Sequence, residues 1–233
     1  MFTGSARYYD AIYAWKDYAD EADVLHHTIQ QRNPWAQTLL DVACGTGRHL
    51  EHLRKNYLVE GLDLDPGLLE IAARRLPSVA LHQGDMAEFD LGRTFDVVTC
   101  LFSSIAYTKT IEKLERTVGN LARHTARRGL VIFEPWILPG DYRYDEVHAT
   151  FVDEPALKIA RVNTSGPRGP VTVLDFHYTV GTPEGIETFT ERHEVGLFSH
   201  DQYLAALTNA GLTPHHSPHG LMGRGLYIGV RTR

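Results

Sequence analysis

Short apolar runs and helical stretches alternate along the first 136 residues. Five runs predict strands buried on both faces, and they cover residues 39–43, 58–62, 79–82, 95–100 and 129–133. Between the last two runs, apolar residues recur with helical spacing and would share one helix face: Ile111, Leu114, Val118, Leu121 and Ala122. Strands separated by helices in this order predict right-handed βαβ units and a parallel sheet. The first part of the chain is therefore expected to form an open α/β fold with helices on both faces of the sheet.

Capping residues predict where several helices begin. Asp65 is a good N-cap, and Pro66 suits the first helical position after it. Ser199 and Gln202 have the spacing of a capping box. Helices are therefore expected over residues 20–31, 47–55, 65–75 and 199–210.

After Trp136 the pattern becomes strand-like and contains no helical stretch until Ser199. Strands are expected over residues 147–151, 157–162, 171–180 and 187–198, with Gly/Pro turns such as 165–170 between them. A last strand over 226–230 returns to the sheet. The expected organisation is a core made of residues 1–136 and 198–233, whose N-terminal segment covers the site as a lid, and an inserted antiparallel lobe at 137–197.

A glycine turn follows the first predicted strand, in the stretch LLDVACGTGRHL at 39–50. Open α/β sheets bind ligands at the carboxyl ends of their strands, so this turn is a candidate binding site. A dinucleotide fingerprint needs a third glycine, but Leu50 occupies that position. What remains is D-x-A-x-G-x-G, in which Gly45 and Gly47 allow close approach of a ligand and Asp41 suits an ammonium rather than a pyrophosphate. S-adenosylmethionine has an ammonium, a sulfonium and no phosphate.

Two further carboxylates follow the next predicted strands. Asp63 ends the second strand, where it could accept both hydrogen bonds of a ribose diol. Asp85 follows the third strand, where it could accept from an adenine amino group. Either residue alone could instead cap a helix or form a turn. Together with the glycine turn, they favour S-adenosylmethionine as the ligand.

Composition restricts the class of protein. The 233 residues are 43% hydrophobic, which is enough for a full core. No run approaches the roughly 20 apolar residues of a membrane span, and the first seven residues do not resemble a secretory signal, so a cytoplasmic location without a membrane partner is expected. Cys44 and Cys100 are too few for a disulfide framework or a zinc site. A net charge of −6 provides no basic footprint, so no nucleic-acid partner is expected.

Several motifs carry a resemblance over nearly the whole chain, and they are Leu39 to Leu50, Gly61 to Leu64, Gly84 to Met86, Cys100 to Ile105, Glu134 to Trp136 and Ser217 to Leu226. With these motifs, the chain resembles class I S-adenosylmethionine-dependent methyltransferases. More narrowly, it is similar to the enzymes that N-methylate TDP-linked aminosugars, of the TDP-desosamine and TDP-mycaminose N,N-dimethyltransferase type. The resemblance implies S-adenosylmethionine as cofactor, S-adenosylhomocysteine as product, a TDP-linked deoxyaminosugar of antibiotic biosynthesis as substrate, one or two added methyl groups, and a homodimer.

The same resemblance implies site residues. Cofactor contacts are implied for Tyr9, Ala43, Asp63, Asp85, Met86 and Phe102. Sugar-nucleotide contacts are implied for Tyr18 and Arg224, and expected also for Ser103, Trp136 and Phe2. In the family, the insertion after the fifth strand forms the sugar-nucleotide pocket. The chain departs from the family at Phe2, where relatives have a tyrosine, at Tyr107, where several have a histidine, and in the poorly matching region 139–157.

Methyl transfer mainly requires a nucleophile aligned behind the methyl carbon and the exclusion of water. An ammonium cannot attack, so the amine must be bound neutral or lose a proton. Tyr107 is the first candidate for holding the amine and Glu134 for orienting the substrate, although a packed aromatic and a capping carboxylate are open alternatives.

Histidines offer further candidates. Asp175 and His177 share one face of a predicted strand, and Glu191 and His193 share a face of another. Either pair could face the sugar or be structural, and His177 is counted among the expected substrate contacts. His215, His216 and His219 have prolines around them that favour a loop, so no metal is expected.

Other classes remain to be weighed against this hypothesis. A nicotinamide oxidoreductase is disfavoured by Leu50, and a nucleic-acid amine methyltransferase by Phe102 to Ile105, where Asn/Asp-Pro-Pro-aromatic would be usual. A non-catalytic S-adenosylmethionine-binding protein would share the same motifs. The nearest alternative is a small-molecule O-methyltransferase or an amino-acid N-methyltransferase.

Overall fold

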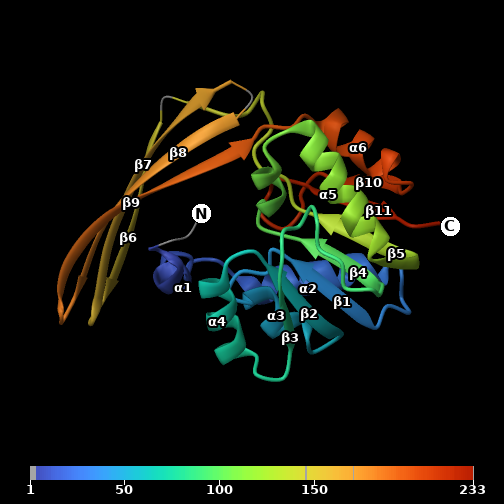
Figure 1. Ribbon diagram of the computed structural model, residues 1–233, viewed down its shortest axis with the longest axis horizontal. Coiled ribbons are helices and arrows are strands. Elements are labelled where there is room, and N and C mark those ends of the chain that lie inside the picture. Colours follow the sequence, from blue (N-terminus) through green and yellow to red (C-terminus); the bar gives the residue numbers. More distant parts are fainter. Residues whose placement is uncertain (1–3, 145, 170, 233) are drawn as a thin grey trace.

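A seven-stranded sheet forms the centre of the larger part of the molecule (Figure 1). The computed structural model describes residues 4–144, 146–169 and 171–232. The strands lie in the order β3 (Ala80–Gln83), β2 (Leu58–Asp63), β1 (Thr38–Val42), β4 (Phe95–Cys100), β5 (Thr125–Phe133), β11 (Leu226–Val230) and β10 (Thr213–Ser217). The five strands β1 to β5 are parallel, and β11 runs antiparallel to both neighbours. The predicted open α/β fold is confirmed.

Helices cover both faces of this sheet (Figure 1). One face carries α2 (Tyr18–Gln30), α3 (Arg48–Leu53) and α4 (Pro66–Arg75), and the other carries α5 (Ile111–Arg123) and α6 (His200–Asn209). Successive residues of β1 serve the two sides, because Leu39 belongs to the core with α2 and α3 while Leu40 belongs to the core with α5 and α6. Both predicted caps are present, at Asp65 and in the Ser199 capping box.

The edge strand β10 corrects one expectation, because the sequence favours a loop around its prolines. Pro214 pairs with Gly229 in the antiparallel ladder between β10 and β11. A proline is tolerated there because an edge strand has no second neighbour that needs its missing N–H. The last strand therefore returns to the sheet as a hairpin rather than alone.

A second, four-stranded antiparallel sheet follows β5 in the chain and forms the long curved arrows at the left of Figure 1. Its strands, in order, are β6 (Val147–Glu154), β7 (Leu157–Arg168), β8 (Val171–Thr182) and β9 (Gly185–Gly196). The predicted turn at 165–170 is shorter than expected, because Gly166 and Pro167 pair with Val173 and Thr172. We call this sheet, residues 147–196, the lobe.

The N-terminal segment lies between the lobe and the core (Figure 1). It consists of η1 (Ala6–Tyr8) and α1 (Tyr9–Ile12). Tyr8 and Ile12 pack against lobe residues Ile159, Tyr178 and Val180. On the core side, Asp10 accepts a hydrogen bond from Thr46 Oγ1 at 2.7 Å and forms an ion pair with Arg75. The segment is therefore attached to both parts.

Phe2, expected at the sugar, lies outside the described residues. Among the helices of the described ranges, none combines the length and the apolar character needed to cross a membrane.

Candidate active site

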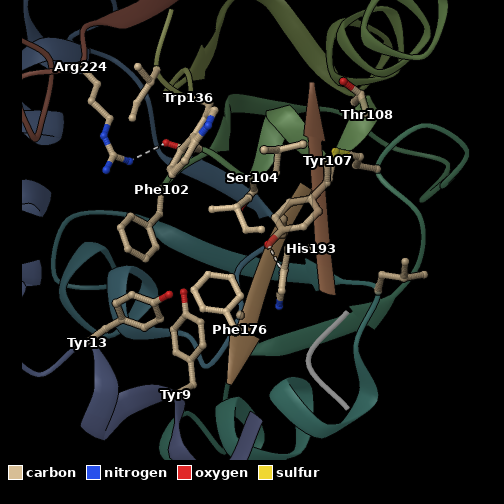
Figure 2. A pocket seen from close by; sticks show the side chains of 18 of the residues that line it. Tyr9, Tyr13, Phe102, Ser104, Tyr107, Thr108, Trp136, Phe176, His193 and Arg224 are labelled. Atoms are coloured by element: carbon tan, nitrogen blue, oxygen red, sulfur yellow. Dashed lines mark hydrogen bonds between the residues drawn. The ribbon is translucent and has the colours of Figure 1, made fainter. Parts of the chain in front are cut away.

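A cavity of about 610 Å³ lies where the carboxyl ends of the parallel strands, the N-terminal segment and the lobe meet (Figure 2). This volume is in the range of small-molecule binding sites. The strand ends contribute Ala43, Asp63, Gly84 and Phe102, and the lobe contributes Arg161, Phe176 and His193. Tyr9 in α1 and Tyr13 directly after it close one side, as Figure 2 shows.

The glycine turn after β1 has three residues with left-handed backbone, Ala43 (φ 60°), Gly45 (φ 57°) and Gly47 (φ 77°). A Cβ at Gly47 would lie 2.9 Å from Leu76 Cδ1, so this glycine permits packing against the residue that ends α4. A Cβ at Gly45 would meet no described atom within 4 Å, and Gly45 lines the cavity. Gly45 therefore leaves space for a ligand, whereas Gly47 serves the fold.

Asp63 ends β2 and lines the cavity. Its Oδ2 accepts from the N–H of Gly45 at 2.8 Å, and its Oδ1 accepts from the N–H of Asp65 at 2.9 Å. Burial raises the pKa of Asp63, although these donors oppose the shift. An ionised carboxylate has about four acceptor sites, so these two hydrogen bonds do not saturate it, and acceptor capacity remains for a ligand diol.

Asp41 lies deeper, in a small recess beside the turn that also includes Tyr18 and His49. Its Oδ1 accepts from Thr99 Oγ1 at 2.7 Å. Burial raises the pKa of Asp41 to about 6, and the nearby charge of Asp63 acts in the same direction. Because Ala43 and Gly45 line both spaces, the recess continues the main cavity toward a negative charge.

Asp85 and Met86 follow β3 and also line the cavity. Asp85 Oδ1 accepts from the N–H of Ala87 at 2.9 Å, and Oδ2 lies 3.0 Å from Lys113 Nζ. Burial opposes ionisation, but the Ala87 N–H and the Lys113 ammonium outweigh it and lower the pKa of Asp85. Asp85 therefore presents a negative charge at the end where an adenine is expected.

The loop after β4 is held by Glu134. Phe102 (φ 51°) and Ser103 (φ 61°) are both left-handed, and the Phe102 N–H donates to Glu134 Oε2 at 2.8 Å. Glu134 is fully buried and is not among the residues that line the cavity. Its observed contact is thus with the loop that carries Phe102, and contact with substrate stays a prediction.

Arg224 enters the cavity from the other side (Figure 2). Its Nη1 donates to Ser103 Oγ at 3.0 Å, and its guanidinium carbon lies 4.9 Å from the centre of the Trp136 ring. Ser103 Oγ in turn donates to the carbonyl of Pro135 at 2.7 Å. A guanidinium oriented in this way can bind two phosphate oxygens at once.

Tyr107 lies in η2 (Ser104–Thr108) and points into the cavity toward the lobe (Figure 2). Its hydroxyl is 2.6 Å from His193 Nδ1, and His193 Nε2 lies 3.6 Å from Glu191 Oε2. Burial raises the pKa of Tyr107 well above that of a free tyrosine. The neutral phenol is therefore the form present at ordinary pH.

The structure corrects the choice between the two histidine pairs. His177 is exposed and lies on the outer face of β8, whereas its neighbours Phe176 and Tyr178 face inward. His193 lines the cavity instead. Tyr18 is also placed differently from the expectation, because it borders the small recess and not the main cavity.

Several cavity residues escaped the sequence interpretation, among them Tyr13, Arg161 and Phe176. Arg161 Nη1 donates to the hydroxyl of Tyr13 at 3.0 Å, and its guanidinium carbon lies 5.2 Å from the Phe176 ring centre. For the two lobe residues, the sequence shows only that successive side chains of a strand point to opposite faces. It does not show which of the two faces lines the cavity. Within the described ranges, no group of three or more His, Cys, Asp or Glu side chains could hold a metal ion.

The residues fit S-adenosylmethionine at several points. Open space beside Gly45 admits a narrow ligand, and Asp63 retains acceptor positions for a ribose. Asp41 provides a carboxylate for the ammonium of the methionyl group. The helix after the turn begins at Arg48, with Gly47 as its N-cap, and has no third glycine, which agrees with a ligand that carries no phosphate.

Comparisons with known proteins agree with this geometry. Residues 39–129 match the family model described as "Methyltransferase domain". The chain is 42% identical to dTDP-4-amino-2,3,4,6-tetradeoxy-D-glucose N,N-dimethyltransferase of Saccharopolyspora spinosa, over 96% of this chain and 91% of that protein. It is also 42% identical to dTDP-3-amino-3,4,6-trideoxy-alpha-D-glucopyranose N,N-dimethyltransferase of Streptomyces venezuelae, over 95% of each.

A solved structure of a sugar methyltransferase is also similar to this chain over its full length. The S-adenosylmethionine-bound structure of CalS10, an amino pentose methyltransferase from Micromonospora echinaspora involved in calicheamicin biosynthesis, is 37% identical. It covers 100% of this chain and 98% of its own, with a TM-score of 0.87.

The fold, the strand-end carboxylates and these matches define a class I S-adenosylmethionine-dependent methyltransferase. The similarity extends through the lobe to nearly the full length of the relatives. The chain belongs to the family of the dTDP-aminosugar N,N-dimethyltransferases.

Proposed function

We propose that this protein transfers one or two methyl groups from S-adenosylmethionine to the amino group of a TDP-linked deoxyaminosugar in natural-product biosynthesis. The observation that carries the proposal is that one and the same cavity is lined by the strand-end residues Ala43 and Asp63 and by the lobe residues Arg161 and His193. A cofactor at the strand ends would thus face a second compartment large enough for a substrate. The names of the relatives support an aminosugar nucleotide as that substrate.

S-adenosylmethionine supplies an electrophilic methyl carbon, which forms a bond to nitrogen as its bond to sulfur breaks, leaving S-adenosylhomocysteine. The protein has to align the amine and exclude water, and positioning of this kind supplies roughly 7 to 11 kcal/mol. Tyr9, Tyr13 and Phe102 form the aromatic wall at this place, with Tyr13 and Phe102 ring centres 5.1 Å apart. No metal is needed for this reaction.

Two arginines are suited to the diphosphate. Arg224 is oriented by Ser103 and Trp136, and Arg161 is oriented by Tyr13 and by Thr150, whose Oγ1 accepts from Nη2 at 2.9 Å. Both side chains line the cavity, one from the core and one from the lobe. Guanidinium groups held in this way bind phosphate oxygens in pairs.

Product analysis tests the proposal. The purified protein is incubated with S-adenosylmethionine and a panel of TDP-3-amino and TDP-4-amino deoxysugars, since one of the two relatives described above is named for a 4-amino sugar and the other for a 3-amino sugar. We expect mass gains of one or two methyl groups located on nitrogen by fragmentation. Methylation confined to hydroxyl groups of amine-free analogues would instead indicate an O-methyltransferase.

A homodimer is also proposed. Val147, Phe151, Val162 and Ile186 lie on the outer face of the lobe with exposed fractions of 68%, 72%, 38% and 80%. The strand register places these four side chains on one face, opposite to the face that lines the cavity. The same face also carries His177 and the Asp175–Arg192 ion pair, so its surface is mixed. Exposed apolar side chains set among polar ones suit a contact with a second copy of the chain.

We also propose a cytoplasmic location, because the two cysteines form no disulfide with each other. Cys44 and Cys100 are both buried and unpaired with each other, which fits a reducing compartment.

A further inference from the structure

A line of polar side chains runs from the cavity into the lobe and ends at the N-terminal segment. Tyr107 and His193 line the cavity, and behind them lies Glu191, which is 5% exposed. Glu191 Oε1 accepts from the N–H groups of Gly4 and Ser5 at 2.7 and 2.9 Å, and its Oε2 accepts from Ser5 Oγ at 2.6 Å. The three side chains therefore connect the sugar compartment to the segment that covers it.

The partners of His193 assign its tautomer. Nε2 lies 3.6 Å from Glu191 Oε2, which is an ion-pair distance and not a hydrogen bond, and the negative carboxylate favours a proton on this nearer nitrogen. We therefore assign the proton to Nε2. Nδ1 is then an acceptor, and the Tyr107 hydroxyl donates to it over 2.6 Å. Although burial opposes ionisation, the His193 ring and the Ser5 and Gly4 donors lower the pKa of Glu191 to about 2. The carboxylate is therefore negative at neutral pH, as an imidazolium beside it requires.

We propose that Tyr107, His193 and Glu191 form a proton relay that converts the bound ammonium of the sugar to the free amine. This inference rests on the proposed function. The Tyr107 oxygen accepts a proton from the ammonium as the N–H bond breaks, and the Tyr107 O–H proton passes to His193 Nδ1. The nitrogen keeps its electron pair for bonding to carbon. The positive charge moves from the ammonium to the imidazolium, next to the charge of Glu191.

Tyrosine acts in this relay as a carrier and not as an anion. A tyrosine with a raised pKa is a poor base alone, but its hydroxyl can accept one proton while it donates another. Other titratable or charged groups near this network, among the described residues, include Asp63 from β2, Tyr9 from α1, Tyr13 just after α1, and Arg161 and Tyr178 from the lobe. Tyr107 is the catalytic residue, and His193 and Glu191 act through it.

The relay also bears on the number of methyl groups. A sugar amine that has gained one methyl group emerges as an ammonium, so a second transfer requires the loss of another proton. Each transfer consumes one S-adenosylmethionine, so the spent cofactor is exchanged between the two steps, and the His193 imidazolium can release its proton to water at that exchange. The relay is then ready to deprotonate the methylated ammonium when the N-terminal segment again excludes water. Loss of the relay should therefore reduce the second methylation at least as much as the first.

The test compares pH profiles of three variants with wild type, using the aminosugar nucleotide that wild type methylates. Tyr107→Phe, His193→Gln and Glu191→Gln change the relay with little change in shape. At pH 7 we expect kcat to fall about 100-fold for Tyr107→Phe and His193→Gln, the lower end of general-base effects, with KM within about threefold. As pH rises and free amine becomes available from solution, the rates of these variants should approach wild type. The monomethyl product should accumulate at pH 7.

The control is His215→Gln, an exposed histidine on β10 at the far edge of the sheet, for which the wild-type profile is expected. Unchanged kcat in Tyr107→Phe and His193→Gln, or a deficit equal at every pH, would overturn the relay while leaving N-methylation by wild type intact. If wild type itself adds no methyl group to nitrogen, the proposed function fails and the relay with it. The affinity for S-adenosylmethionine is measured for each variant as a test of folding. A variant that has lost this affinity is misfolded and is set aside, and the two remaining variants then decide the test.

Discussion

Arg224 donates a hydrogen bond from Nη1 to Ser103 Oγ over 3.0 Å, which joins the segment before β11 to the loop after β4 across the cavity. Trp136 stacks on the same guanidinium. Two left-handed glycines, Gly223 and Gly225, flank the arginine and leave its backbone compact. The guanidinium is thus oriented before a substrate binds, which reduces the entropy lost on binding.

Arg224→Lys should raise KM for the sugar nucleotide by roughly tenfold, because an ammonium cannot bind two oxygens in the same plane. The dissociation constant of S-adenosylmethionine should remain unchanged. Steady-state kinetics measures the first quantity and calorimetry the second. An equal loss of affinity for both ligands would mean that Arg224 supports the cavity as a whole.

Asp63→Ala should weaken S-adenosylmethionine binding roughly 10- to 100-fold in calorimetry, as expected for the loss of hydrogen bonds to a charged group. Asp63→Asn retains one acceptor for the Gly45 N–H, so its affinity for S-adenosylmethionine should lie between those of wild type and Asp63→Ala. The matched control is Asp65→Asn, because asparagine caps α4 as well as aspartate does. Unchanged affinity in Asp63→Ala would contradict the cofactor assignment.

Cofactor affinity should depend on pH through Asp41. Its folded-state pKa is raised to about 6, so the carboxylate is ionised above that pH and protonated below it. If only the ionised form holds the ammonium of S-adenosylmethionine, affinity is full above pH 6 and falls up to tenfold per unit of pH below it. Calorimetry from pH 7.5 to 5 should show this decline in wild type, and Asp41→Asn should bind weakly at every pH. The same decline persisting in Asp41→Asn would assign it to another group.

Three glycine variants separate folding from binding. Gly45→Ala and Gly92→Ala place a side chain at φ 57° and 64° with no described atom within 4 Å, so each should lose about 1 to 2 kcal/mol of unfolding free energy. Only Gly45→Ala should also lose S-adenosylmethionine binding, because Gly45 lines the cavity. Gly47→Ala should lose more stability than either, since its Cβ would meet Leu76 at 2.9 Å. Urea denaturation and calorimetry measure both effects, and equal binding in all three would refute the role given to Gly45.

Phe151→Glu should convert the proposed dimer to a monomer in light scattering, because it replaces an exposed apolar side chain on the outer face of the lobe with a charge. Leu58→Glu is the control, since Leu58 is 75% exposed at the start of β2 on the core. It should leave the oligomeric state unchanged. A monomeric wild-type protein would show that the apolar face has no second copy as its partner.

The strand-end part of the site could be predicted from the sequence, because each of its signals depends on residues that are close together along the chain. The glycine turn, Asp63 and Asp85 follow strands that the apolar runs define, and parallel strands end at one edge of the sheet. The histidines show where this reasoning stops. Alternation separates His177 from its inward-facing neighbours, but which face is inward depends on how the lobe packs against the core and the N-terminal segment. Only the assembled structure selects His193.

Glu134 shows a second limit. Its position at the end of β5 predicts a residue of the site, and it does lie beside the site. Whether a side chain there points toward the cavity or into the protein depends on the loop at Phe102 and Ser103. The left-handed backbone of this loop cannot be predicted from the pattern of apolar and polar residues.

The attachment of Asp10 to both Thr46 and Arg75 ties the covering segment to the very turn that receives the methyl donor. A ligand that orders this turn therefore also orders α1, and with it the aromatic side chains that cover the acceptor. Linkage makes such an effect mutual: the factor by which one substrate tightens the other applies equally in reverse. An enzyme arranged in this way favours the ternary assembly over either half-filled one.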